Sequence, residues 1–338
     1  MPGLGYTSFL GIAKEAAWGT RITPATKFLA MTPRGDGLFG DSPLLKSAGI
    51  NEVSTHRTRK VHPGARNAGG QIEFEVPWEG AELLFKHAFG KVVVSTETPP
   101  CTHTYTISPP DWLDLTGLSL EAKTDYLVSS TSGAAAWAAG LNSFWYEGSL
   151  ITFVEFSLSK DGFLLCTMGV AAEDEIQATS STGTPTASTL CNFYNDGTGS
   201  GVQWNGVAAV VTDFRVRLDL GLDVARRGIG NRLIKKPVPG KIAVTGSFKA
   251  EFEGVTHFDD FRAATARSLY LRLVGPTAAS QDIKIEVPVA IIAPRAKAVV
   301  DNEGIIYADL PFEGFWDGTN REIKMTLING INTVAAGY

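Results

Sequence analysis

The chain has 338 residues, of which 44% are hydrophobic and 19% charged, and its formal net charge is −5. This composition is typical of an ordinary globular protein and excludes a largely disordered chain. No apolar run reaches the roughly 18 residues of a membrane-spanning helix. The mild negative charge argues against a surface that grips nucleic-acid phosphates.

The N-terminal sequence and the cysteines indicate a protein that stays in the reducing compartment where it is made. The N-terminus has no basic stretch followed by an apolar core, so we expect no export signal. The three cysteines, Cys101, Cys166 and Cys191, are far apart and lack a C-x-x-C spacing. We expect them to be reduced, partly buried thiols, with a reactive thiol as the alternative.

The first elements along the chain are an arm and a strand. Residues 1–40 are rich in Gly, Pro and Thr, and Pro24 and Pro33 interrupt them. This pattern predicts an extended arm with one or two short strands. From Gln71 to Val76 polar and apolar residues alternate, which predicts a half-buried strand.

A helix and a hairpin follow in the first half. The apolar residues from Ala81 to Phe89 have helical spacing, and Gly90 can cap the helix. A strand is expected from Leu118 to Ala122. Alternating residues from Ile151 to Leu158 and from Phe163 to Val170, with Asp161-Gly162 in the turn between them, predict a hairpin.

The second half repeats this order. A Ser/Thr/Gly/Pro-rich stretch at 178–188 reads as a linker, and the Gly-rich stretch at 195–206 as a turn. Strands are expected around Ser247–Glu253, at Leu269–Leu273, and at Ile283–Ala293 with a return strand at Ile305–Phe315. Because Asp260 falls on the apolar stripe of the second helix, we expect that helix to be short or less buried.

An internal repeat links the two halves. Pro63–Glu75 aligns without a gap with Pro239–Glu251, 176 positions later, and Phe85 and Phe261 keep the same offset. The polar and apolar residues of the two strands alternate in the same phase, which indicates a shared register. The repeat indicates that one ancestral unit is duplicated in the chain. Such a pseudo-symmetric subunit suits assembly into a closed ring.

The expected fold is mainly β, a sandwich or partial barrel with one flanking helix in each of two tandem units. We expect an N-terminal arm with the first strands at 1–40, a first unit at 41–178, a linker at 179–188 and a second unit at 189–338.

Catalytic signatures are missing from the sequence. The five histidines show no H-E-x-x-H spacing, and no G-x-S-x-G elbow occurs. The glycines near 197–201 and 228–230 do not form G-x-G-x-x-G. Asp259 and Asp260 are adjacent, so on a helix they point in different directions. We therefore expect no enzyme, no metal and no cofactor.

The order of several motifs resembles the tail tube proteins of long, non-contractile-tailed bacteriophages. The resemblance is carried by the N-terminal phrase from Phe9 to Thr20 followed by Pro24, by the segment from Asp213 to Phe252, and by Tyr307–Gly314 with the later Leu327–Gly330. Each motif alone is weak, since it consists of Gly, Pro and apolar positions. Their order covers most of the chain. The insert around 130–145 has no counterpart in the second half.

The resemblance implies a structural virion protein that is assembled in the host cytoplasm. Its units would join those of neighbouring copies into a ring β-barrel, and stacked rings would form the tail tube through which DNA is ejected. The duplication favours a trimer with pseudo-sixfold walls over a hexamer. The implied partners are further copies of the chain, a tape measure protein, and terminator and tip proteins; genomic DNA would pass without specific binding, and no membrane is involved.

Two other functions stay open. The chain could be another tail component, such as a terminator or distal tail protein. It could also be a duplicated β-sandwich that binds carbohydrate, with its seven tryptophans as a stacking platform, although scattered tryptophans more often pack cores and interfaces.

Basic loops occupy matching places before the two repeated strands, at Glu52–Gly64 and Asp223–Gly240. We expect them to dock onto an acidic rim of the adjacent ring, where Glu173, Asp174 and Glu175 are possible partners. Solvated hairpin tips are the alternative. The candidate residues are Arg57, Arg59, Lys60, Arg226, Arg227, Arg232, Lys235 and Lys236.

The polar sides of the repeated strands are candidates for the lumen wall. Carboxylates that face inward would repel DNA phosphates, although Lys249 counts against this reading and the same side could instead cover the outside of the tube. The candidate residues are Gln71, Glu73, Glu75, Ser247, Glu251 and Glu253.

Overall fold

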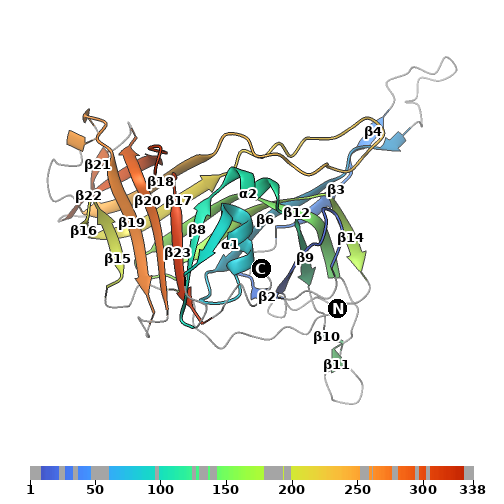
Figure 1. Cartoon of the computed structure of the whole chain (residues 1–338), viewed down its shortest axis with the longest axis horizontal. Coiled ribbons are helices and arrows are strands. Elements are labelled where there is room, and N and C mark those ends of the chain that lie inside the picture. Colours follow the sequence, from blue (N-terminus) through green and yellow to red (C-terminus); the bar gives the residue numbers. More distant parts are fainter. Residues whose placement is uncertain are drawn as a thin grey trace.

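The computed structural model shows a mainly β protein, as the sequence predicted (Figure 1). The described residues are 9–22, 27–32, 37–46, 61–95, 99–123, 127–128, 136–137, 143–178, 193, 199–251, 259–260, 262–275, 281–293, 297–301 and 305–330. Most of them lie in antiparallel strands.

Eight antiparallel strands form one continuous sheet, here called the central sheet, which runs through both halves of the chain. Each strand is hydrogen-bonded to the next, in the order β3 (Phe39–Asp41), β6 (Asn67–Glu75), β13 (Leu165–Ala172), β12 (Ser143–Ser159), β17 (Val211–Asp219), β18 (Ala243–Glu251), β22 (Ile305–Gly314) and β21 (Lys297–Asp301). The halves join where β12 pairs with β17, from Phe153 opposite Asp219 to Ser159 opposite Asp213.

Alternate residues of the central sheet are buried, as the period-2 patterns predicted. On β18, Val244, Phe248 and Ala250 are buried, whereas Thr245, Ser247 and Lys249 lie on the other side. The buried side packs against a helix, since the ring centroids of Phe85 and Phe156 are 5.9 Å apart. The opposite side is called the polar face below.

An outer layer in the first half continues from the central sheet. Its strands pair in the order β2 (Lys27–Ala30), β1 (Phe9–Lys14), β9 (Leu118–Lys123), the first part of β12, and β14 (Asp174–Ala178). The long strand β12 belongs to both layers because its register shifts between Tyr146 and Ser149 and again between Ile151 and Phe153. Such bulges bend a strand and increase its twist.

A second outer layer combines strands from both halves. They pair in the order β16 (Val207–Ala209), β15 (Gly201–Trp204), β19 (Arg267–Val274), β20 (Asp282–Ile292), β23 (Lys324–Asn329), β8 (Cys101–Ile107) and β7 (Gly90–Val94). The turn between β15 and β16 has Asn205 at φ 54° and Gly206 at φ 78°, the pair of positive values that a two-residue hairpin turn needs. The layer therefore ties β8 of the first half to β23 of the second.

The first predicted helix is confirmed as α1 (Glu82–Phe89), with Gly90 at φ 88° as its C-cap. A second helix, α2 (Pro109–Leu113), begins with prolines in its first turn, where a missing N–H costs nothing. In the second half only a short helical segment is described around Asp260. That carboxylate is 5% exposed, and Arg267 donates to it at 2.8 Å.

The predicted hairpin of the first half is confirmed by the pairing of β12 with β13. The predicted return strand of the second half is more complex. β20 and β22 pair only where Ala290–Ile292 lies opposite Phe312–Gly314, because β21 is the main neighbour of β22 on that side. The predicted linker at 179–188 lies outside the described residues.

Two arms leave the central sheet at matching places. The first arm, residues 42–66, lies between β3 and β6 and contains the hairpin of β4 (Leu44–Lys46) and β5 (Val61–Pro63). The second arm, residues 220–242, lies between β17 and β18 and runs across the top of the first half to the β4–β5 hairpin (Figure 1). A short pair, β10 (Leu127–Val128) with β11 (Ala136–Trp137), lies apart from the layers.

The two segments that align in the sequence both form strands of the central sheet. β6 spans residues 67–75 and β18 spans residues 243–251, so both ends keep the offset of 176. Their buried residues also coincide, since Phe74 and Ala250 occupy the same position of the alignment, as do Ile72 and Phe248, and all four are buried.

Candidate functional site

The polar face consists of rows of side chains that cross the central sheet. The strand registers place the members of each row directly opposite one another. One row contains Glu73, Thr167, Glu155, Arg217, Thr245 and Glu313. The next row contains Glu75, Leu165, Ser157, Arg215, Ser247 and Pro311. Residues far apart in sequence thus form continuous bands across both halves.

Acidic residues outnumber basic ones on this face between β6 and β22. The alternation of buried and accessible positions places eight carboxylates and three cations there. The carboxylates are Glu73, Glu75, Glu155, Asp213, Asp219, Glu251, Asp309 and Glu313, and the cations are Arg215, Arg217 and Lys249. The face is therefore net negative.

Neighbouring side chains hold the three cations against the sheet. Arg215 donates to Glu155 at 2.8 Å, and this hydrogen bond raises the pKa of Arg215. The guanidinium of Arg217 lies 3.7 Å from the ring centroid of Phe153, and the ammonium of Lys249 lies 5.0 Å from that of Tyr307. Cation–π contacts of this kind offset part of each positive charge locally.

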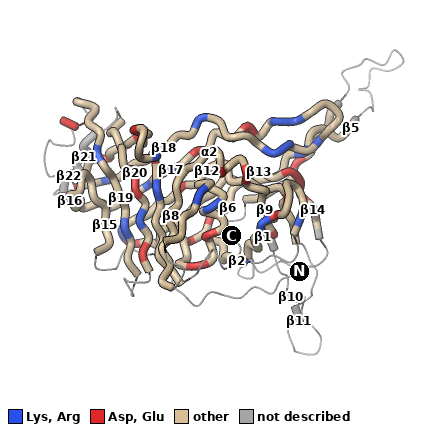
Figure 2. Tube along the Cα trace, in the orientation of Figure 1, with Lys and Arg blue, Asp and Glu red and all other residues tan. Residues whose placement is uncertain are grey.

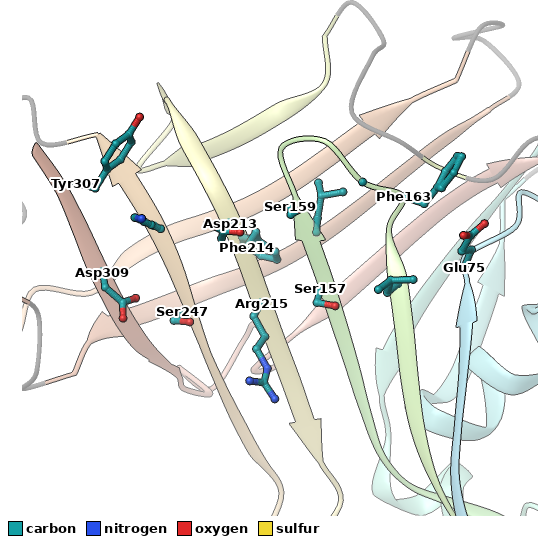
Figure 3. A pocket seen from close by; sticks show the side chains of 14 residues that line it. Glu75, Ser157, Ser159, Phe163, Asp213, Phe214, Arg215, Ser247, Tyr307 and Asp309 are labelled. Atoms are coloured by element: carbon teal, nitrogen blue, oxygen red, sulfur yellow. The ribbon is translucent and has the colours of Figure 1, made fainter. Parts of the chain in front are cut away.

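A hollow of about 820 Å³ opens on the polar face near one end of its strands. Figure 3 shows Glu75, Ser157, Asp213, Arg215, Ser247 and Asp309 around it, contributed by strands of both halves. Its walls mix charged, hydroxyl and apolar groups. No single set of convergent groups marks it as a catalytic centre among the described residues.

The predicted lumen residues come together on one side of one sheet. Gln71, Glu73 and Glu75 of β6 and Ser247 and Glu251 of β18 all lie on the polar face, whereas Glu253 lies outside the described residues. The sequence reasoning missed the carboxylates of β12, β17 and β22. The same period-2 alternation in those strands was the signal that could have found them.

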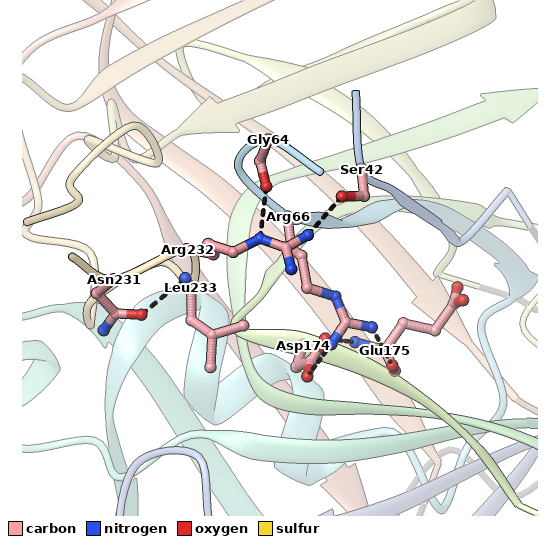
Figure 4. A network of polar contacts seen from close by, with 8 residues as sticks. All are labelled: Ser42, Gly64, Arg66, Asp174, Glu175, Asn231, Arg232 and Leu233. Carbon is pink, nitrogen blue, oxygen red and sulfur yellow. Dashed lines mark hydrogen bonds and ion pairs between the residues drawn. The ribbon is translucent and has the colours of Figure 1, made fainter. Parts of the chain in front are cut away.

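The second arm is fixed to the first half by Arg232 (Figure 4). The Nε of Arg232 donates to the carbonyl oxygen of Gly64 at 2.7 Å, and its Nη2 donates to the hydroxyl of Ser42 at 2.8 Å. In return, the backbone N–H of Arg66 donates to the carbonyl of Arg232 at 3.0 Å. Arg66 is itself paired with Asp174 at 2.7 Å.

Two further basic residues of the second arm, Arg227 and Lys236, contact the first half, and Arg226 bonds within the arm. Figure 2 shows them as blue segments along the arm. Arg227 donates to the carbonyl of Arg66 at 2.9 Å and to the side chain of Asn67, and Lys236 donates to the carbonyl of Leu113. Arg226 donates to the carbonyl of Lys236 within the arm, at 3.2 Å.

The structure thus places Arg227, Arg232 and Lys236, three of the five predicted basic residues of the second arm, on the chain's own first half. Ile229 at the tip is fully exposed, so the tip is left for other contacts. Of the predicted residues of the first arm, Arg57, Arg59 and Lys60 lie outside the described residues.

The two ends of the central sheet have open pairing edges. Among the described strands, β3 pairs only with β6, and β21 pairs only with β22. Phe39 on β3 is 57% exposed. Unpaired N–H and C=O groups at a sheet edge are a template for pairing with another chain.

Two further features bear on function. Cys101 and Cys166 are buried free thiols, and burial raises the pKa of both, which keeps a thiol in its less reactive form. Within the described residues, no helix has the length and apolar character needed to cross a membrane.

The comparison with protein families agrees with these features. The family model described as "Phage tail tube protein" matches residues 5–314 of the chain. No curated protein matches the chain at a significant level. The chain belongs to the phage tail tube protein family, so it is a structural component of the virion tail that is assembled in the host cytoplasm. Membership implies self-assembly, and proteins of this structural family are generally not enzymes.

Proposed function

We propose that three copies of this chain close into a ring, that the rings stack into the tail tube of a long-tailed phage, and that the tube is a passive conduit for DNA during ejection. The observation that carries the proposal is the central sheet. It runs without a break through both halves, has one acidic uncovered face, and ends in two strands with an open edge.

Ring closure would satisfy both edges at once. The edge at β3 of one copy would meet the edge at β21 of the next copy, so that every copy uses the same two surfaces. Such a head-to-tail contact closes into a ring when the rotation between copies fits. Closure also removes the exposed edges, which otherwise favour uncontrolled aggregation.

The size of the closed sheet fits a duplex. Each copy supplies eight strands, so three copies supply about 24, each about 4.8 Å from the next and tilted by about 40°. The circumference is then about 150 Å and the backbone diameter about 48 Å. Side chains reduce the open width to about 40 Å, which accommodates B-DNA with its hydration.

The polar face would line the lumen. On the other side of the sheet the described residues are packed against α1 and the core, whereas eight carboxylates on the polar face would repel phosphates. Repulsion keeps the duplex from binding the wall as it passes. The hollow near Ser157 would then be part of the lumen wall rather than a ligand site.

The internal repeat supports closure of the ring by three copies. We take residues 41–178 and 189–338 as the two tube units of one chain, derived from a single ancestral unit, so that three chains give six similar wall segments. The partners would be further copies of this chain, a tape measure protein, and the terminator and tip proteins. A terminator or distal tail protein is the alternative within the same tail.

Electron microscopy of the purified protein tests the proposal. Two-dimensional class averages should show hollow rings or filaments with a pore of about 40 Å, and their symmetry distinguishes three copies from six. Compact particles without a pore, in the presence of tail-initiation partners, would overturn the proposal and favour the carbohydrate-binding alternative.

A second experiment tests the stacking role of the second arm. Replacing residues 226–236 by a short Gly/Ser linker should leave the secondary structure unchanged and allow rings but no long tubes. Normal tubes from this variant would refute the assignment of the arm to stacking.

A further inference from the structure

The two arms leave the central sheet through the same backbone arrangement. Asp41 lies opposite Asn67 at the end of β3, and Asp219 lies opposite Ala243 at the end of β17. Beyond these pairs the outgoing and returning segments of each arm approach each other closely, at a point here called the neck of the arm. A Cβ atom on Gly64 would lie 2.6 Å from the carbonyl oxygen of Pro43, and one on Gly240 would lie 2.4 Å from that of Gly221.

The correspondence extends into the arms. Leu45 pairs with His62 in the first arm, and Asp223 donates its N–H to the carbonyl of Val238 in the second. Pro43 and Gly221 occupy the same place at the necks of the two arms. The next residue of the first arm, Leu44, therefore corresponds to Leu222 of the second arm. The arms can be compared residue by residue over these first positions.

The corresponding residues differ in burial. The second arm lies on the first half of its own chain, where Ile234 is 4% exposed and Leu222 packs against the core. In the first arm, Leu44 and Leu45 are 61% and 62% exposed. The first arm extends past the end of the sheet, beyond the other described layers (Figure 1). Two adjacent exposed leucines indicate a surface that another molecule covers.

We propose that the first arm is a strap between copies, in which the β4–β5 hairpin lies on the second half of a neighbouring copy within the same ring. This inference rests on the proposed ring. In a pseudo-sixfold ring the first and second halves alternate, and the same rotation relates each half to the next one around the ring. The arm of a second half lies on the first half of its own chain. By the same rotation, the arm of a first half would lie on the second half of the adjacent copy.

The expected receiving surface is apolar, as the hairpin is. β13 ends at Ala172 and is followed by Glu173 and Asp174, whereas β22 ends at Gly314 and is followed by Phe315 and Trp316. Each pair lies beside the base of an arm, since β13 pairs with β6 and β22 pairs with β18.

The two docking sites differ in chemistry, as the two arms do. Asp174 holds Arg66 where the basic second arm docks, and Phe315 and Trp316, 42% and 56% exposed, lie where the hairpin with Leu44 and Leu45 would dock. The cations of the second arm thus meet carbonyl oxygens and polar side chains in one step, and apolar residues would meet an apolar site in the other, so the two docking sites select different partners.

A cysteine pair tests the strap directly. Leu45→Cys and Trp316→Cys are combined in a Cys191→Ser background, and assembled tubes are treated with a short bis-maleimide cross-linker. Each single-cysteine variant is a control, and Leu45→Cys with Val93→Cys is the matched pair, since Val93 is an exposed residue of similar size on β7. Denaturing gels should show covalent dimers and trimers for the first pair alone.

The length of the ladder decides between contacts within and between rings. A ladder that stops at the number of copies in one ring, three in the proposed assembly, supports the strap. A ladder that continues beyond that number would assign the hairpin to stacking and overturn it. Assembled tubes without cross-linked product would also overturn the strap, while leaving the proposed tube intact. If the parent protein forms no rings at all, both proposals fail.

A charge variant gives an independent measurement. Leu44→Asp with Leu45→Asp should keep the circular dichroism spectrum and shift the protein from rings to monomers in analytical ultracentrifugation by at least tenfold in the association constant. Val93→Asp is the control and should assemble normally. Ring formation by the double variant at the parent's concentration would refute the strap.

Discussion

Gly70 and Gly246 occupy matched positions in β6 and β18, and each leaves room for a backbone carbonyl of the adjacent segment. A Cβ atom on Gly70 would lie 2.0 Å from the carbonyl oxygen of Gly37, and one on Gly246 would lie 2.4 Å from that of Arg215. Gly70 also has φ 142°, a value that favours glycine. Both strands therefore have a glycine where a backbone carbonyl of an adjacent segment of the chain approaches closely.

Gly246→Ala should destabilise the fold by about 1–3 kcal/mol, since the added methyl group meets both a carbonyl and the ring of Phe312 at 2.4 Å. Chemical denaturation measures the free energy of unfolding. Gly228→Ala in the second arm is the control, because its nearest neighbour is the flexible side chain of Lys235 at 3.5 Å. Equal effects at the two sites would contradict this account.

His87 should make the fold sensitive to acid. It is fully buried on α1, and both ring nitrogens lack a hydrogen-bond partner within the described part of the chain. Burial, with smaller contributions from Lys86, Lys14 and Lys236, lowers the pKa of His87 from 6.5 to about 3. The folded protein thus keeps the neutral ring.

The sign of the effect follows from this difference. Below pH 6.5 the unfolded chain binds a proton that the folded chain does not, so stability falls as the pH drops towards 3, by up to about 1.4 kcal/mol per pH unit. His87→Leu should flatten the dependence of the unfolding free energy on pH in this window. Parallel curves for the parent and the variant would show that His87 is not responsible.

Reversing charges on the polar face should make the tube bind DNA. Glu75→Lys, Glu251→Lys and Glu313→Lys together replace three of its carboxylates by cations. Short duplexes should then co-sediment with tubes at low salt and be released as salt rises, because phosphate contacts are salt-dependent. Asp111→Lys with Asp259→Lys, on exposed positions of other layers, is the control. Equal binding by both variants would argue that the polar face lies outside.

Ile229 at the tip of the second arm should act in stacking and not in folding. Its side chain is fully exposed, so Ile229→Asp should leave the thermal unfolding temperature unchanged. Because burial of an isoleucine contributes about 1.5–3 kcal/mol, loss of that contact at each arm should shift tubes to short stacks in electron micrographs. Long tubes of normal stability would contradict this role.

The fold class was predictable because strand signals are local. Alternation over Gln71–Val76 placed β6, and the helical spacing before Gly90 placed α1. Pairing between distant strands has no such local signal. Nothing in the sequence around Thr102 indicates that β8 pairs with β23, since a strand edge accepts any partner that the rest of the fold brings to it.

The candidate surfaces were predictable in part for the same reason. Alternation in the two aligned strands placed Glu73, Glu75, Ser247 and Glu251 on the polar sides of those strands, and the structure brings them onto one face of one sheet. Their place in a lumen wall stays a prediction. The docking of Arg232 on Gly64 and Ser42 depends on the path of a strand-free arm. Such a path is set by tertiary contacts, so the sequence indicated the arm's charge but not the surface on which it lies.

The pairing of β8 with β23 has a consequence for protein synthesis. His103 and Asn329, which bind each other across these strands at 3.0 Å, are 226 residues apart in sequence. A ribosome must deliver nearly the whole chain before this layer can close, and contacts of such long range make folding slow. Incomplete chains therefore lack a finished outer layer.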